Sequence, residues 1–170
     1  MRKVLLIGYG NPGRLDDGLG PALAARFAER PESAALTVES DYQLTIEDAA
    51  QVAEHDVVVF ADASVNGREP FFFKRIAPAE PPGLGFSSHS AQPEGVLALA
   101  RQLFGARTEG YTLGIRGYEF NEFGERLSDR ARANLAQAAA FLEALLDSGD
   151  FSGAATEDDG SPGAASPRRE

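Results

Sequence analysis

The sequence GYGNPGRLDDGLG, from Gly8 to Gly20, decides the fold because of what stands on either side of it. Residues 3–7 before it, KVLLI, predict a strand of the kind that parallel sheets cover on both faces. The residues after it predict a helix from about Leu19 to Arg30. The segment is therefore a strand-to-helix loop at the carboxyl end of a strand, where open α/β sheets bind their ligands.

The glycines of this loop allow two interpretations. They match G-x-G-x-x-G, the dinucleotide fingerprint, and Glu39 would then read the ribose. However, Pro12 removes a backbone N–H that a phosphate would accept from, and Asp16 and Asp17 would add negative charge beside the phosphate. A like-charge pair at ~4 Å costs several kcal/mol at an intermediate dielectric constant. The loop thus suits a cation better, and a Rossmann-type dinucleotide-binding module is the alternative.

The other periodic segments predict an α/β fold. The β-α-β-α-β order of the first half implies a parallel sheet with right-handed crossovers. Too few residues precede the strand at 71–76 for a parallel crossover, so it should run antiparallel at an edge of the sheet. The remaining strands are expected at 35–39, 57–61 and 110–116, and the remaining helices at about 45–53, 93–104 and 127–146.

Composition limits the class of protein. A chain of 170 residues is most simply one domain, and the absence of cysteine excludes disulfides, thiolate metal ligands and a cysteine nucleophile. The net charge of -10 argues against nucleic acid and anionic membranes as partners. No signal-peptide pattern or membrane-length apolar run occurs, so a cytoplasmic protein is expected. We expect one domain over residues 1–146 and a disordered tail over 147–170, which lacks periodicity.

Acidic residues and one histidine stand where strands end or in a long loop. Asp16 and Asp17 follow the first strand, Asp62 ends the strand at 57–61, and His89 lies in the loop after the edge strand. Parallel strands deliver their carboxyl ends to one edge, so these side chains can converge. Two oxygens and an imidazole nitrogen suit nickel, zinc or iron with open coordination positions. Helix- or turn-capping roles for the aspartates remain open at this point.

Four features of the chain resemble the hydrogenase maturation endopeptidases, which remove the C-terminal extension from the precursor of the nickel-iron hydrogenase large subunit. The resemblance covers about residues 1–145 and implies a three-layer α/β/α sandwich. Its sheet would be mixed and five-stranded, mostly parallel with one antiparallel strand. The four features are Gly8-x-Gly10-Asn11-Pro12-x-x-x-Asp16-Asp17-Gly18-x-Gly20, then Tyr42-Gln43-Leu44, then the apolar strand that ends in Asp62, and then Ser88-His89.

The resemblance also implies a site and a client. The metal ligands would be Asp17, Asp62 and His89, with Asp16 as the substitute for Asp17, and these four residues form the expected catalytic set. The protein would have no cofactor of its own, because the nickel arrives in the large-subunit precursor, although a surrogate divalent metal can occupy the site. Activation of water by the metal and by Asp16 as a base both stay open. A metallohydrolase with its own zinc is a second alternative function.

Overall fold

The computed structural model describes residues 2–31, 35–79 and 91–156. Its five strands form one sheet in the order β2-β1-β3-β5-β4, in which every neighbouring pair is parallel except β4 and β5. The elements are β1 (Val4–Tyr9), η1 (Leu15–Gly18), α1 (Leu19–Ala28), β2 (Leu36–Asp41), α2 (Asp48–Ala53), β3 (Val57–Ser64), β4 (Phe71–Ile76), α3 (Pro93–Phe104), β5 (Glu109–Arg116), α4 (Asp129–Ser148) and α5 (Phe151–Ala154).

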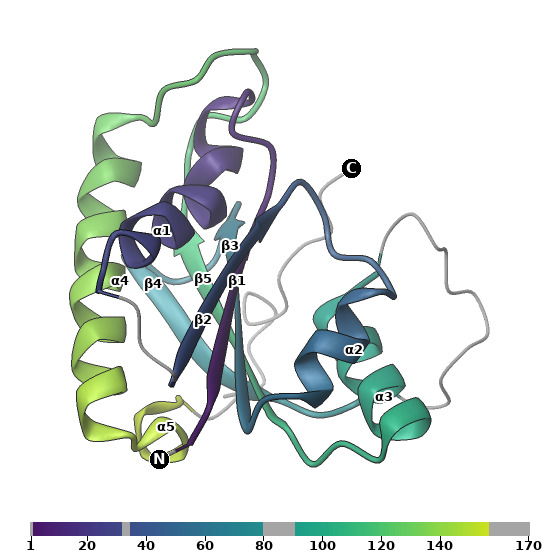
Figure 1. Ribbon diagram of the computed structural model, residues 1–170. Coiled ribbons are helices and arrows are strands. Elements are labelled where there is room, and N and C mark those ends of the chain that lie inside the picture. The colour runs from purple at the N-terminus through teal and green to yellow at the C-terminus, as the bar shows by residue number, and fades with distance from the viewer. Residues whose placement is uncertain (1, 32–34, 80–90, 157–170) are drawn as a thin grey trace.

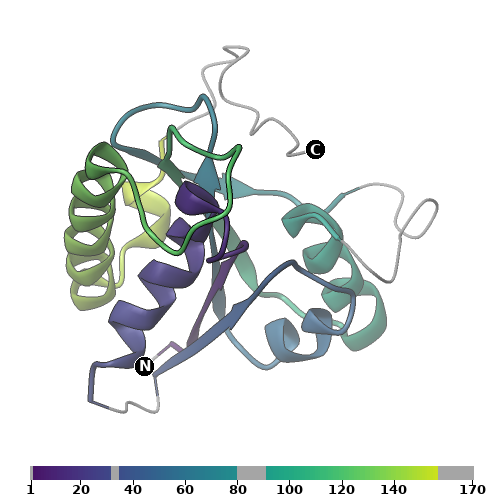
Figure 2. The ribbon, with the colours of Figure 1, turned by 90° about the horizontal axis from the view of Figure 1, so that it is seen from above.

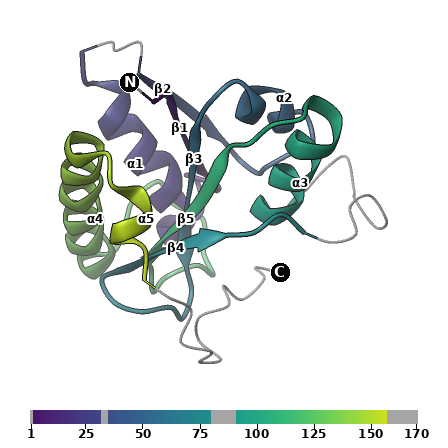
Figure 3. The ribbon, with the colours of Figure 1, turned by 90° about the horizontal axis from the view of Figure 1, so that it is seen from below.

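The helices cover both faces of the sheet. The long helix α4 packs with α1 and α5 on one face, and α2 and α3 lie together on the other (Figures 1 and 3). The prediction of an α/β fold with a mixed sheet is confirmed. So is the antiparallel edge strand, because β4 pairs only with β5 among the described strands.

Two hydrophobic clusters, one on each face, explain the unbroken apolar runs. Val4 and Leu6 of β1 point into the cluster under α1 and α4, whereas Leu5 and Ile7 point into the cluster under α2 and α3. Side chains alternate faces along a strand, so a strand covered on both faces needs apolar residues at every position. The run Val57–Phe60 in β3 divides between the two clusters in the same way.

The strand β3 runs further than the sequence indicated. Asp62 was expected to end it, but β3 continues to Ser64, and Asp62 lies opposite Gly114 of β5. The reason is the partner strand. Since β5 extends to Arg116, it offers backbone partners to β3 beyond the apolar run. A polar residue at the rim of a sheet does not stop a strand that still has a neighbour.

The predicted boundary at residue 146 is too early. The helix α4 continues to Ser148 and ends at Gly149, whose φ of 73° is the left-handed conformation that favours glycine. The chain then turns into α5, whose Phe151 is 3% exposed, and the N–H of Thr156 donates to the carbonyl of Phe73 in β4. The expected tail therefore belongs to the fold as far as Thr156, while 157–170 lie outside the described residues.

No helix among the described residues is both long enough and apolar enough to span a membrane.

We predict that Phe151→Ala lowers the free energy of unfolding by about 3 kcal/mol, because it removes a buried ring that lies 5.8 Å from the ring of Tyr111, centroid to centroid. Urea denaturation followed by circular dichroism measures the change. The matched control is Phe123→Ala, because the side chain of Phe123 is 86% exposed and should contribute little. Equal effects of the two substitutions would contradict the assignment of Phe151 to the core.

Candidate metal site and its supporting loops

The loop between β1 and α1 is folded tightly against the sheet, and its glycines make this approach possible. A Cβ atom added to Gly20 would lie 2.3 Å from the carbonyl oxygen of Tyr9 and 2.6 Å from that of Ala61. Gly10 has a φ of 142°, and a Cβ there would lie 2.1 Å from the carbonyl oxygen of Asp17. The glycines thus allow the start of α1 to pack directly against β1 and β3. This packing explains why glycines recur in the loop without a role for a bound dinucleotide.

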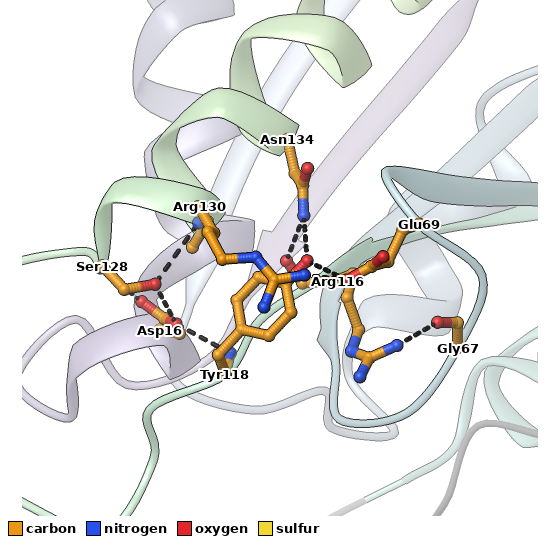
Figure 4. A network of polar contacts seen from close by, with 9 residues as sticks. Asp16, Gly67, Glu69, Arg116, Tyr118, Ser128, Arg130 and Asn134 are labelled. Carbon is orange, nitrogen blue, oxygen red and sulfur yellow. Dashed lines mark hydrogen bonds and ion pairs between the residues drawn. The ribbon is translucent and has the colours of Figure 1, made fainter.

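Asp16 is the most deeply buried charged residue that the structure describes, with an exposed fraction of 0%. Its carboxylate accepts four hydrogen bonds, drawn in part in Figure 4. The donors are the backbone N–H groups of Tyr118 (2.8 Å), Glu119 (3.0 Å) and Ser128 (2.7 Å) and the hydroxyl of Ser128 (2.7 Å). One side chain therefore joins the β1–α1 loop to the loop that leads from β5 into α4.

These contacts decide the ionisation of Asp16. Burial alone would raise the pKa of Asp16. The hydrogen bonds, led by that of the Ser128 hydroxyl, lower it by a larger amount, so the pKa lies below its ordinary value. The carboxylate thus stays charged, with both oxygens engaged and no surface open to solvent. This environment fits a structural anchor better than it fits a metal ligand or a general base, the roles left open by the sequence.

Asp17, which directly follows Asp16 in the chain, is only partly buried. Its Oδ2 accepts from the backbone N–H of Asn11 at 2.8 Å, and the side-chain oxygen of Asn11 accepts from the N–H of Gly13 at 2.8 Å. Side chains of the loop therefore bind backbone N–H groups of the same loop and stabilise its conformation. Neither aspartate caps the helix α1: its N-cap is Gly18, without a side-chain cap hydrogen bond, because Asp16 and Asp17 lie in the turn η1 that precedes it.

Asp62 comes to the same edge of the sheet from β3. The parallel register pairs Gly8 of β1 with Ala61, so Asp62 lies one residue beyond this pair, on a strand that the turn η1 also contacts. The side chain is half-buried, and its Oδ1 accepts from the N–H of Ala63 at 2.8 Å. Asp17 and Asp62 thus share the carboxyl-end edge, as the strand order predicts.

The third expected ligand is His89. His89 falls within 80–90, outside the described residues. Among residues 2–31, 35–79 and 91–156, no three histidine, aspartate or glutamate side chains form a group that could hold a metal ion. The assignment of Asp17, Asp62 and His89 as a ligand set therefore stays a prediction.

A second polar network, which the sequence analysis missed, supports the neighbouring loops (Figure 4). The Tyr118 hydroxyl donates to Glu69 and accepts from the side-chain amide of Asn134 at 2.9 Å. The guanidinium carbon of Arg130 lies 4.1 Å from the Tyr118 ring centroid, and its Nη2 is 2.7 Å from Glu69. The hydrogen bond from Tyr118 is the main reason why the pKa of Glu69 lies below its ordinary value. No local pattern signals these contacts, because the partners come from three separate segments.

Seen from above, the loops of this edge lie together (Figure 2). The N–H of Leu15 donates to the carbonyl of Gly124, and the N–H of Gly124 donates to that of Gly13. The β1–α1 loop therefore pairs with the β5–α4 loop through backbone as well as through Asp16. These hydrogen bonds hold the two loops together at the edge of the sheet where Asp17 and Asp62 lie.

No family model matches the chain, and no curated protein matches it in sequence. Solved structures do resemble it. One is the crystal structure of the [NiFe] hydrogenase maturation protease HycI from Thermococcus kodakarensis KOD1, with 21% identity and a TM-score of 0.67, covering 86% of this chain and 93% of that one. Another is the hydrogenase maturating endopeptidase HybD from E. coli, with 21% identity and a TM-score of 0.60, covering 86% and 94%.

A third similar structure, an uncharacterized protein from Wolinella succinogenes, has 24% identity and a TM-score of 0.61, covering 87% of this chain and 99% of that one. At identities this low, the structural similarity shows a common fold and nothing further about function. The matches cover 93%, 94% and 99% of the three solved structures.

We predict that Asp16→Asn destabilises the protein by about 2–4 kcal/mol, because the amide group would turn a donor toward backbone donors in a buried site. The adjacent Asp17→Asn is the matched control. Its amide oxygen can still accept from the N–H of Asn11, so the expected loss is less than about 1 kcal/mol. Thermal and urea unfolding of both variants test the difference, and equal losses would show that Asp16 is not the anchor.

Proposed function

We propose that this protein is an endopeptidase that removes the C-terminal extension from the precursor of a nickel-iron hydrogenase large subunit. The fold that it shares with HycI and HybD supports this reaction class. Fold alone does not imply function, so the proposal needs a site. The sequence motif from Gly8 to Gly20 and the positions of two aspartates support the site proposed here.

The observation that carries the proposal is that Asp62 of β3 lies at the same edge of the sheet as Asp17, which stands in the turn after the neighbouring parallel strand β1. We infer that these carboxylates and the imidazole of His89 bind the nickel that the client protein carries. Carboxylate and imidazole donors suit a first-row divalent ion, and three protein ligands leave coordination positions for the client. Nickel is then part of the substrate, and this protein needs no resident metal.

Such a site can couple cleavage to the presence of nickel. Three ligands bind an ion modestly when alone and much more tightly when the client supplies the rest of the coordination shell. A protease that prefers the loaded client needs this difference in affinity between loaded and empty forms. The donor set thus acts as a sensor of nickel, and the peptide bond is cut after the loaded client has docked.

The hydrogen bonds of Asp16 also limit which group can activate water. Both oxygens of Asp16 are engaged in hydrogen bonds inside the protein. We therefore assign Asp16 a positioning role: it holds the turn that carries Asp17. The Lewis acidity of the nickel, or the carboxylate of Asp17 or Asp62, both only partly buried residues, would then promote the attack of water.

The test is to mix the purified protein with nickel-loaded and with nickel-free precursor and to measure which one is shortened. We predict that only the loaded precursor is cut. Asp17→Asn, Asp62→Asn and His89→Ala should each slow processing at least as much as the about 10–100-fold that loss of a hydrogen-bond partner of a metal ligand costs. Circular dichroism should show an unchanged fold, and Glu122→Gln, a neutralised exposed carboxylate on the β5–α4 loop, is the control.

Several outcomes would contradict the proposal, each in a different way. Equal cleavage of both precursors would remove the nickel sensor, and normal processing by all three ligand variants would remove the site assignment. Stoichiometric zinc in protein purified without a chelator would favour a metallohydrolase with its own metal. Micromolar binding of NAD or FAD would favour the dinucleotide-binding module.

A further inference from the structure

A small hollow lies beside the loop that carries Asp17, at the carboxyl ends of β1 and β2. Its volume is about 220 Å³, enough for one long side chain, and its described lining residues are Gly10, Pro12, Pro21, Ser40, Asp41 and Tyr42. The N–H of Gly10 donates to the carbonyl of Asp41 at 3.0 Å, which joins the two strand ends. Because a Cβ atom added to Gly10 would lie 2.1 Å from the carbonyl oxygen of Asp17, the hollow adjoins the backbone at Asp17.

The lining of this hollow includes two prolines and a tyrosine, together with Ser40 and the acidic residue Asp41. The prolines are Pro12 and Pro21, and the tyrosine is Tyr42, a residue that is 69% exposed. The Oδ1 of Asp41 accepts from the N–H of Tyr42 at 2.8 Å, which fixes the carboxylate next to the aromatic residue. An aromatic ring beside a carboxylate suits a side chain with an apolar stem and a cationic head, which is the chemistry of lysine and arginine.

The electrostatic surroundings favour the same ligand. The pKa of Asp48, in the first turn of α2, is raised first by burial and then by the charges of Asp41, Glu47 and Glu39, although the N–H of Thr45 acts in the opposite direction. Carboxylates are therefore concentrated around the end of β2, and the whole chain has a net charge of -10. A negative potential of this kind attracts a cationic group and increases its rate of association.

We propose that this hollow binds a lysine or arginine side chain of the protein that the enzyme cleaves. The inference rests on the proposed function, because it names a second feature of the same client beside its metal. Asp41 and Tyr42 are then specificity residues: they bind the client and do not take part in the reaction. The Tyr42-Gln43-Leu44 segment, noted in the sequence for its resemblance alone, acquires a physical role.

Cleavage kinetics with nickel-loaded precursor test this role. Asp41→Asn keeps an oxygen that can accept from the N–H of Tyr42, so the fold should be retained while the charge is lost. We predict that Asp41→Asn and Tyr42→Ala each raise KM by about fivefold and change kcat by less than about twofold. The controls on the same edge, Glu122→Gln and Phe123→Ala, should change KM by less than about twofold. Equal effects of variants and controls, or a loss confined to kcat, would overturn the proposal.

A binding measurement separates this inference from the proposed function, because it needs no cleavage. The ¹⁵N-labelled full chain is titrated with acetyl-arginine amide and with its uncharged analogue, acetyl-citrulline amide. We expect amide shifts at Gly10 and Tyr42 with the arginine compound, much smaller shifts with citrulline, and no arginine response in Asp41→Asn. Equal responses to the two compounds would disprove the cationic pocket even if the precursor is cut. A protein that responds to arginine but leaves every precursor intact would retain the pocket and lose the protease assignment.

Discussion

The arrangement of this protein depends on the buried carboxylate of Asp16. Removing a charged carboxylate from water costs several kcal/mol unless hydrogen bonds replace the lost hydration. Here the replacement comes from Tyr118, Glu119 and Ser128, which follow Asp16 by more than a hundred residues in the chain. Ser128 has two roles, because its hydroxyl donates to Asp16 and also accepts from the N–H of Ala131 as the N-cap of α4. The first loop, the last loop and the longest helix therefore form one unit.

This constraint divides the roles of the two adjacent aspartates. Asp16 points inward to its donors, and Asp17, the next residue in the same short turn, remains partly exposed at the edge of the sheet. The preceding Leu15 has a φ of 53°, which is uncommon for a residue with a side chain, and it is 4% exposed. The backbone at the buried Leu15, directly before the buried carboxylate of Asp16, is thus held in an unusual conformation. Such conformations are often found at functional sites.

The carboxyl-end edge brings together features that the proposals treat as parts of one recognition surface. Asp17 and Asp62 stand over β1 and β3, and the hollow beside Tyr42 stands over β1 and β2. A client would then have to satisfy two binding requirements before cleavage, one for its metal ion and one for its cationic side chain. Two modest, independent interactions multiply in affinity when one rigid frame offers both, so specificity would not require either contact to be strong.

The sequence by itself determined the parallel direction of the first strands, the antiparallel edge position of β4, and the arrival of Asp17 and Asp62 at one edge of the sheet. These features follow from periodicity and local chain geometry, which neighbouring residues encode. Only the tertiary structure decided which aspartate of the pair is buried, and that Phe151 completes the core. Asp16 and Asp17 are chemically identical, and their difference arises from donors far away in the chain, which no local pattern can specify.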